Sequence, residues 1–261
     1  MAEFGKNKKP DYLLVFDSCV DIPRELLDDE NIAILNCRCN IGDTEYLDDL
    51  YQSVSAGEFF KMMRDGALPQ TSQPSIAQIR EVFEKPLRRG QSVVCFCFSS
   101  KLSGTYETTA HIAEQIREEL IAEGVQNPGE IYVIDTALAS IAVGIVALEA
   151  IRLRTAGLTP SELASWAQEA KYFVNGCFMV DRFDWLVAGG RIPQVVASFG
   201  SMLDVKPMLK FSLEGALVPF SVAHGRKKGI KQMAEYYLKH VEDINDGHVI
   251  IIGNADCQKD A

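Results

Sequence analysis

Short apolar runs alternate with helical patterns in the first half of this chain, and this alternation limits its fold more than any other feature. The clearest run is Val93–Phe98, which is apolar along both faces and is typical of a fully buried strand. Parallel strands need long crossover connections, which are usually helices. The order therefore predicts an α/β fold whose N-terminal domain has three layers and a mainly parallel sheet. Strands are predicted at 12–16, 31–39, 93–98 and 131–134, and helices at 55–65, 76–83, 105–124 and from 138 onwards.

Gly, Thr and Pro gather at residues 155–161, which marks the predicted domain boundary. We assign residues 1–157 to the N-terminal domain and residues 158–261 to a smaller C-terminal α/β domain. Helix-favouring residues begin just before Ala261, so we expect this second domain to be cut short or to lack its usual end. Its predicted elements are helices at 162–171, 183–188, 195–202 and 227–243 and strands at 174–180, 205–209, 216–222 and 249–252.

Charge and cysteine usage exclude several classes of function. The net charge of -10 disfavours a nucleic-acid-binding protein, whose surface should be basic. Seven cysteines form no C-x-x-C pair, four scattered histidines give no zinc pattern, and no glycine-rich nucleotide motif opens a predicted helix. We therefore expect no metal and no cofactor. The two C-x-C pairs fall in strand-like runs and are interpreted as core residues.

Location is predicted from the terminus and from the most apolar stretch. The first ten residues are polar and contain lysines, without the apolar segment of a secretory signal. Leu138–Ile151 is too short to span a bilayer and contains Glu149, so it is predicted as a buried helix. Together with reduced cysteines, these features predict a cytoplasmic protein without a transmembrane segment.

Two hydroxyl-rich segments precede predicted helices, Thr71–Ser75 (TSQPS) and Ser99–Tyr106 (SSKLSGTY). A helix start offers free backbone N–H groups and the positive end of the helix dipole, so two converging starts could hold a small anion. Ser99 and Ser100 also end a buried strand, at the sheet edge where α/β folds bind ligands. The alternative is that these hydroxyls only cap the helices, a common role of Ser and Thr.

Several motifs along the chain resemble those of the DegV family. TSQPS, SSKLSGTY and GGRI together, in family order, make the resemblance specific, although each motif alone is weak. The matching motifs cover nearly the whole chain: VFDS at 15–18 with DIP at 21–23, TSQPS at 71–75, SSKLSGTY at 99–106, VIDT at 133–136 with Ala139-Ser140, GGRI at 189–192, KP at 206–207 and RKK at 226–228.

The resemblance implies a carrier that binds one long-chain fatty acid between two domains and has no catalytic residues. Characterised relatives present the bound carboxylate to a separate ATP-binding kinase subunit, and acyl phosphate is made there. The side chains implied for the carboxylate are Thr71, Ser72, Ser99, Ser100, His224 and Arg226. The second-domain side chains expected to line the acyl tunnel are Phe178, Ile192, Val195, Phe199, Met202 and Met208.

Two positions depart from the family pattern. Many relatives carry arginine where His224 stands and histidine where Asn254 stands, and these positions flank the carboxylate in kinase-linked members. The departures bear on presentation to a kinase more than on lipid binding. Arg226 is an alternative cation, and His224 could pair with a carboxylate when protonated.

Two other classes of function stay open from the sequence. One is an enzyme that uses a serine or histidine on a small acyl or phosphoryl substrate, although no G-x-S-x-G motif or Walker motif is present. The other is a structural or regulatory module that has lost its ligand, which the changes at His224 and Asn254 would fit.

Overall fold

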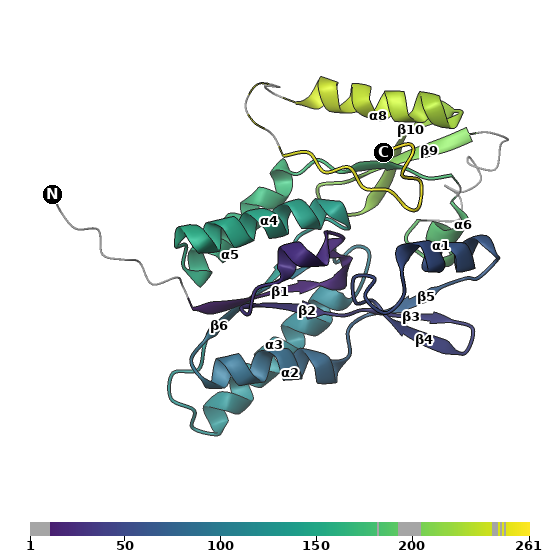
Figure 1. Ribbon diagram of the computed structural model, residues 1–261. Coiled ribbons are helices and arrows are strands. Elements are labelled where there is room, and N and C mark those ends of the chain that lie inside the picture. Colours follow the sequence, from purple (N-terminus) through teal and green to yellow (C-terminus); the bar gives the residue numbers. More distant parts are fainter. Residues whose placement is uncertain (1–10, 182, 193–204, 242–244, 246, 248) are drawn as a thin grey trace.

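The computed structural model of the protein describes residues 11–181, 183–192, 205–241, 245, 247 and 249–261. Its centre is a four-stranded parallel sheet with strand order β2-β1-β6-β7, here called the first sheet (Figure 1). Helices α2 and α3 cover one face, and α4 and α5 cover the other. The predicted three-layer domain with a parallel sheet is therefore confirmed. Its elements are β1 (Tyr12–Asp17), β2 (Ile32–Leu35), β6 (Ser92–Cys97), β7 (Ile131–Asp135), α2 (Ile76–Arg88), α3 (Thr105–Ala122), α4 (Ile141–Ala156) and α5 (Pro160–Ala170).

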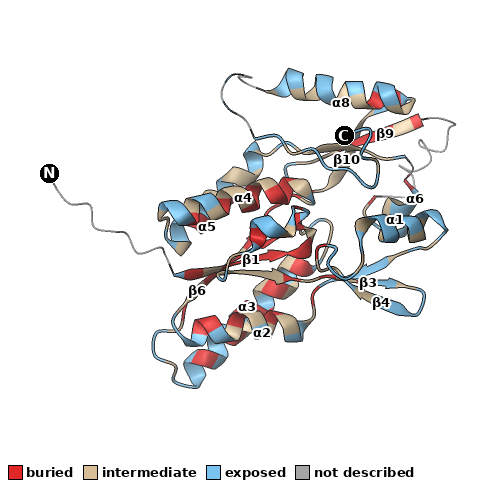
Figure 2. Ribbon diagram, in the orientation of Figure 1, coloured by how far each residue is buried: buried red, intermediate tan, exposed pale blue. Residues whose placement is uncertain are grey.

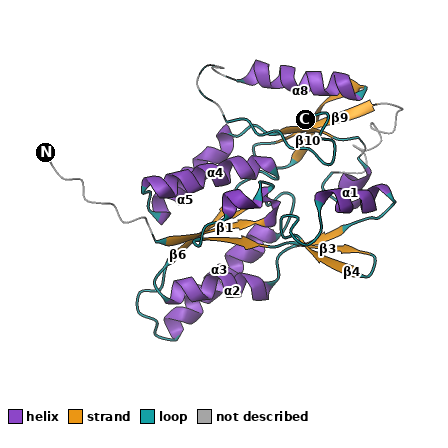
Figure 3. Cartoon of the chain, in the orientation of Figure 1, coloured by secondary structure: helices purple, strands orange, loops and turns teal. Residues whose placement is uncertain are grey.

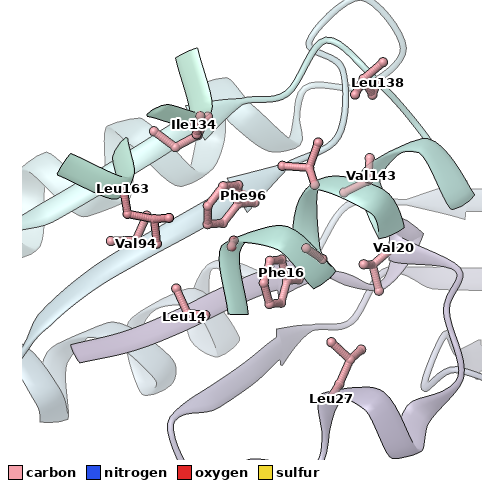
Figure 4. Close-up of a cluster of buried hydrophobic side chains, with 14 of the residues drawn as sticks. Leu14, Phe16, Val20, Leu27, Val94, Phe96, Ile134, Leu138, Val143 and Leu163 are labelled. Carbon is pink, nitrogen blue, oxygen red and sulfur yellow. The ribbon is translucent and has the colours of Figure 1, made fainter. Parts of the chain in front are cut away.

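Successive residues of the central strands supply two different cores. Phe16 and Phe96 point to the α4–α5 side, where their rings stack at 5.3 Å (Figure 4). Val15 and Cys95 belong to the core on the α2–α3 side. Because side chains alternate across a strand, one apolar run serves both faces, and the central strands β1 and β6 are buried except for one residue each (Figure 2). The edge strands β2 and β7 are mostly half-buried. Cys95 and Cys97 lie in this core, as the C-x-C interpretation predicts.

A small antiparallel sheet with order β4-β3-β5 extends from one end of the first sheet (Figure 3). The prediction of one strand over 31–39 is wrong, because the chain breaks at Asn36–Cys37 and its second half joins this other sheet. The Asn36 amide donates to Asp48 O at 2.7 Å, and the Cys37 N–H donates to Ser18 Oγ at 3.0 Å. These side-chain bonds replace the strand ladder. The elements here are β3 (Arg38–Ile41), β4 (Thr44–Leu47), β5 (Gln70–Ser72) and helix α1 (Ala56–Arg64).

The second half of the chain forms an antiparallel sheet with order β10-β9-β8, here called the second sheet. The strands predicted at 205–209 and 216–222 are confirmed as β9 and β10, which form an antiparallel hairpin paired from Val205–His224 to Phe211–Leu217. Helix α8 packs against this sheet, and Ile192 and Leu209 share a small core with Phe183. The elements are β8 (Cys177–Met179), β9 (Val205–Phe211), β10 (Leu217–His224), α6 (Asp184–Ala188) and α8 (Arg226–His240).

The second half lacks one of its predicted strands. The strand predicted at 249–252 is wrong, because these residues pair with no strand and Val249 and Ile252 are exposed. β-type side chains alone do not make a strand without a partner to receive their backbone bonds. The predicted helix at 195–202 lies outside the described residues.

The domain boundary at 157–158 stays a prediction, and packing favours a later division. Helix α5 follows that point, yet its residues Leu163 and Ala167 belong to the core of the first sheet. A division by hydrophobic core would fall after the short helical turn Lys171–Phe173. No helix among the described residues is both long and apolar enough to cross a membrane.

Candidate functional site

The loop after β6 carries the two serines that the sequence places at the sheet edge. Ser99 is fully buried, and its hydroxyl donates to Gly215 O at 2.7 Å while accepting from the Lys101 N–H at 3.1 Å. Gly215 belongs to the turn between β9 and β10. Ser99 therefore joins the first sheet to the second, and its expected contact with a ligand stays a prediction that this geometry disfavours.

Ser100 lies one residue further on and is half-buried. Its hydroxyl donates to Asp135 Oδ2 at 2.6 Å, and its N–H donates to Asp135 Oδ1 at 3.1 Å. Asp135 ends β7, the strand next to β6. The neighbouring strand thus fixes the position and hydrogen-bonding direction of the Ser100 side chain. Asp135 also accepts the N–H of Ala137 at 3.0 Å.

Thr71 and Ser72 lie in β5, an edge strand paired with β3, and both side chains are exposed. The sequence placed them in a turn as possible helix caps, and that interpretation is wrong. The cap of α2 is Ser75, whose hydroxyl accepts the Gln78 N–H at 3.2 Å. The hydroxyls of Thr71 and Ser72 are consequently not used to cap the helix.

Arg191 of the GGRI motif is the residue that the sequence analysis missed as part of the site. Its Nη2 lies 3.5 Å from Thr71 Oγ1, and its Nε donates to Leu102 O at 3.1 Å. Three motifs far apart in the sequence therefore meet at one guanidinium: TSQPS, SSKLSGTY and GGRI. A lone arginine in a glycine-rich turn was the available hint, because such a side chain can reach two loops at once.

His224 is the last residue of β10, and Arg226 is the first residue of α8. His224 is exposed at the end of β10. The Arg226 guanidinium pairs with Asp181 at 3.0 Å and with Asp260. Among the described residues, no hydrogen bond or ion pair connects either side chain to Thr71 or Ser100. Their assignment to the ligand stays a prediction, and Arg226 already has two acidic partners.

Three of the six tunnel candidates are described. Ile192 and Met208 are buried, and Phe178 packs at the edge of the small core with its ring 6.3 Å from that of Phe211. Ile192 follows Arg191 directly, so the polar meeting point of the three loops adjoins apolar side chains of the second half. The other candidates, Val195, Phe199 and Met202, lie outside the described residues.

A buried carboxyl group lies under the Ser99–Ser100 loop. Asp17 is fully buried at the end of β1 and accepts the N–H of Phe98 at 2.7 Å and that of Cys19 at 3.1 Å. Burial raises the pKa of Asp17 to about 7, against the lowering effect of these two hydrogen bonds. Asp17 is the acidic residue of the VFDS motif at 15–18. Through its bond to the Phe98 N–H, it fixes the start of the Ser99–Ser100 loop.

Comparison with known proteins identifies the family of this architecture. The model of the DegV family matches residues 12–261. A DegV domain-containing protein of Clostridium perfringens is 33% identical over 250 residues, covering 96% of this chain and 84% of the relative. A DegV family protein from Thermus thermophilus, whose structure is described as showing fatty acid binding, has a TM-score of 0.73 at 27% identity and covers 88% of this chain and 77% of its own.

A second solved structure agrees with the first. It is DegV of Bacillus subtilis, described as a fatty acid binding protein, with a TM-score of 0.71 at 28% identity over 88% of this chain and 77% of that protein. The match of the family model from the first strand to the last residue, together with these relatives, shows that this chain is a member of the DegV family.

Proposed function

We propose that this protein binds one long-chain fatty acid, with its carboxyl end against the hydroxyls of Thr71 and Ser100. The observation that carries the proposal is the meeting of three loops at Arg191, which contacts Thr71 and Leu102 and is followed by the buried Ile192. Such a place offers hydrogen bonds and a positive charge beside an apolar core. The related proteins described as fatty acid binding support the same ligand.

The acyl chain would supply most of the affinity in this arrangement. Burial of a methylene group contributes about 0.8 kcal/mol, so about fourteen methylenes contribute roughly 11 kcal/mol before the costs of association. The hydroxyls then set the direction of the ligand. Phe178, Ile192 and Met208 are proposed to line part of the path, and methionine suits it because its side chain adapts to chains of different shape.

The protein is further proposed to act as a carrier, presenting the bound acid to a separate ATP-binding kinase subunit. The two-half architecture favours this role, because a ligand between the halves could keep its carboxyl end near the surface beside the exposed Thr71. The rival reading, an enzyme with a serine nucleophile, receives less support. The Ser100 hydroxyl donates to a carboxylate, whereas a serine nucleophile is usually activated by a histidine base.

Native mass spectrometry of the purified protein, followed by denaturing release of bound molecules, tests the proposal. We expect one adduct of fatty-acid mass per chain. A protein that stays free of adduct after incubation with palmitate or oleate would contradict the proposal. Turnover of a long-chain ester by the purified protein would instead favour the enzyme.

The head-group residues are tested by Thr71→Ala combined with Ser100→Ala. This variant should lose about tenfold or more in affinity for palmitate, since each lost hydrogen bond contributes on the order of 1 kcal/mol. The matched control is Thr44→Ala with Ser161→Ala, which removes two exposed hydroxyls from β4 and from the start of α5. Equal palmitate retention by both variants would show that Thr71 and Ser100 do not hold the ligand.

A further inference from the structure

The first sheet has a free edge at β7. Val93 of β6 lies opposite Ile131, and its N–H donates to Glu130 O at 2.8 Å. Because neighbouring parallel strands share hydrogen bonds through alternate residues, the N–H and C=O groups of Ile131 and Val133 turn away from β6. Among the described residues, none bonds to these outward groups. Ile131 and Val133 thus present two hydrogen-bond donors and two acceptors at the edge.

This open stretch of the edge is short. The next outward carbonyl along β7 is that of Asp135, and it already accepts from Lys171 Nζ at 3.1 Å. At the opposite end, the chain enters β7 through Pro128 and Gly129, which lie beside the same edge. An incoming strand can therefore pair fully only along residues 131–133.

A groove of about 610 Å³ runs along this edge, between β7 and helix α3. We call it the α3–β7 groove; it is lined by Ala110, Ala113, Glu114, Arg117 and Ile121 of α3 and by residues 128–133. The side chains of Ile131 and Val133 lie on the same face of the sheet as the groove, packed against the α2–α3 core. The two alanines leave room for side chains from outside, and Ile121 is 57% exposed at the groove.

The charge around the groove is mainly negative. Glu114 and Glu130 line it together with one cation, Arg117, which lies 3.8 Å from Glu114. Glu107 and Glu118 are exposed on the same helix, and neither has an ion-pair partner among the described residues. A positively charged ligand is therefore favoured over a neutral or an acidic one.

We propose that the α3–β7 groove binds an extended, basic peptide segment of a partner protein, which adds to the first sheet as an antiparallel strand beside β7. Two peptide residues spaced i, i+2 would exchange four backbone hydrogen bonds with Ile131 and Val133. Residues directly opposite each other share a face of the sheet, so these two side chains would enter the groove. Apolar side chains suit these positions, and flanking Lys or Arg suits Glu114 and Glu130. This activity is separate from the proposed binding of a fatty acid.

A second copy of this chain is the other occupant that an open strand edge invites. The observations favour a peptide, because the edge lies beside a hollow walled by α3, and a hollow receives a single strand without a helix of its own. Two copies paired through β7 around a two-fold axis would also bring two acidic α3 helices to the same face of the joined sheet. A basic peptide instead meets opposite charge.

The first experiment measures the binding of three fluorescein-labelled peptides, GKVTVKG, GKITIKG and GKFTFKG, to the unaltered protein by fluorescence polarisation. At least one should bind saturably. Methylation of the backbone nitrogens of its two apolar residues should weaken binding about tenfold or more, because each methyl group removes a donor to the edge of β7. Methylation of the threonine nitrogen, which would point away from β7, is the matched control and should leave the affinity unchanged.

The second experiment fills the groove. Ala110→Phe places a ring where the peptide side chains would lie and should lower the affinity of the best peptide about tenfold. Ala122→Phe is the matched control, since Ala122 is an exposed residue of the same helix outside the groove, and it should leave the affinity unchanged. Both variants should keep the bound fatty acid of the unaltered protein in native mass spectrometry, which shows that they fold.

The third experiment reverses the charge. Glu114→Lys with Glu130→Lys should weaken peptide binding about tenfold at low salt and less at high salt, where exposed charges are screened. The matched control is Glu25→Lys with Glu81→Lys, which reverses two exposed charges outside the groove and should have little effect.

Three results would overturn the proposal. One is that none of the three peptides binds saturably, and another is that methylation of the threonine weakens binding as much as methylation of the apolar residues. The third is that the unaltered protein sediments as a dimer in analytical ultracentrifugation and that Ala110→Phe converts it to a monomer, because the groove would then belong to a second copy. Should Ala110→Phe fail to fold, the methylated peptides still decide, since they need only the unaltered protein.

Discussion

The first and second sheets differ in how completely they are covered. In β6 every residue except the first is buried, because helices pack on both faces of the first sheet. In β10 only Ala223 is buried, and all the other residues are half-buried or exposed. A sheet covered on both faces has little freedom to adjust its side chains, whereas a half-covered sheet can repack. The loop that carries Ser99 and Ser100 thus follows a strand of the rigid first sheet. The residues proposed to line the acyl chain lie in the second half of the chain, whose sheet can adjust.

The largest difference should come from removing one aromatic ring from each sheet. Phe96 is fully buried and stacks on Phe16, so Phe96→Ala should lower the free energy of unfolding by about 3–5 kcal/mol. Phe220 of β10 is half-buried, with its ring 4.7 Å from Tyr236, so Phe220→Ala should cost only about 1 kcal/mol. Urea unfolding measures both. Similar losses in the two variants would contradict the difference in rigidity.

The buried carboxyl of Asp17 should make the first sheet sensitive to pH. Its pKa is raised to about 7 in the folded protein, above its value of about 4 in the unfolded chain, so the folded state binds the proton more tightly. The stability that Asp17 contributes is therefore complete below pH 4 and is lost as the pH rises through 7. The loss is on the order of 1 kcal/mol for each pH unit in that window.

Asp17→Asn tests this pH dependence. The variant should be less stable overall, because an amide cannot accept both the Phe98 and the Cys19 N–H. Its unfolding free energy, measured by urea titration from pH 5 to pH 8, should fall less steeply with pH than that of the unaltered protein. Asp181→Asn is the control, since this exposed carboxylate of the second half pairs with Lys206 and Arg226 at the surface and should leave the slope unchanged. Parallel slopes for the unaltered protein and Asp17→Asn would rule out Asp17 as the source.

The smallest difference between a variant and its control is expected at the junction between the two sheets. Gly215 has φ +90°, and an added Cβ would lie 2.3 Å from Ser99 Oγ and 2.8 Å from Ala137 O. Gly215→Ala should cost about 2–3 kcal/mol, from the left-handed backbone and the overlap together. Gly157→Ala is the matched control, because Gly157 has φ +105° with open space around it and should cost only about 1 kcal/mol. Amide hydrogen exchange of the β9–β10 turn should accelerate in Gly215→Ala alone. Equal costs in both variants would mean that the turn does not depend on its contact with Ser99.

Much of the fold follows from local sequence patterns. The central strands, their helices and the β9–β10 hairpin are all confirmed because hydrophobic periodicity reports which faces are buried. The division of residues 31–39 between two sheets escaped prediction, since it depends on hydrogen bonds from Asn36 and Cys37 to residues elsewhere in the chain. The unpaired segment 249–252 escaped it for a related reason. A strand needs a partner, and strand propensity contains no information about one.

The site shows the same division between local and distant information. The sequence by itself determined which hydroxyls follow a buried strand, and Ser100 at the end of β6 is the clearest case. Only the tertiary structure decided that Ser99 is used by Gly215, that Ser100 donates to Asp135 and that Arg191 reaches Thr71 across 120 residues. The physical reason is that a hydroxyl has one proton to donate, and the atom that receives it is set by the packing of distant segments rather than by neighbours in sequence.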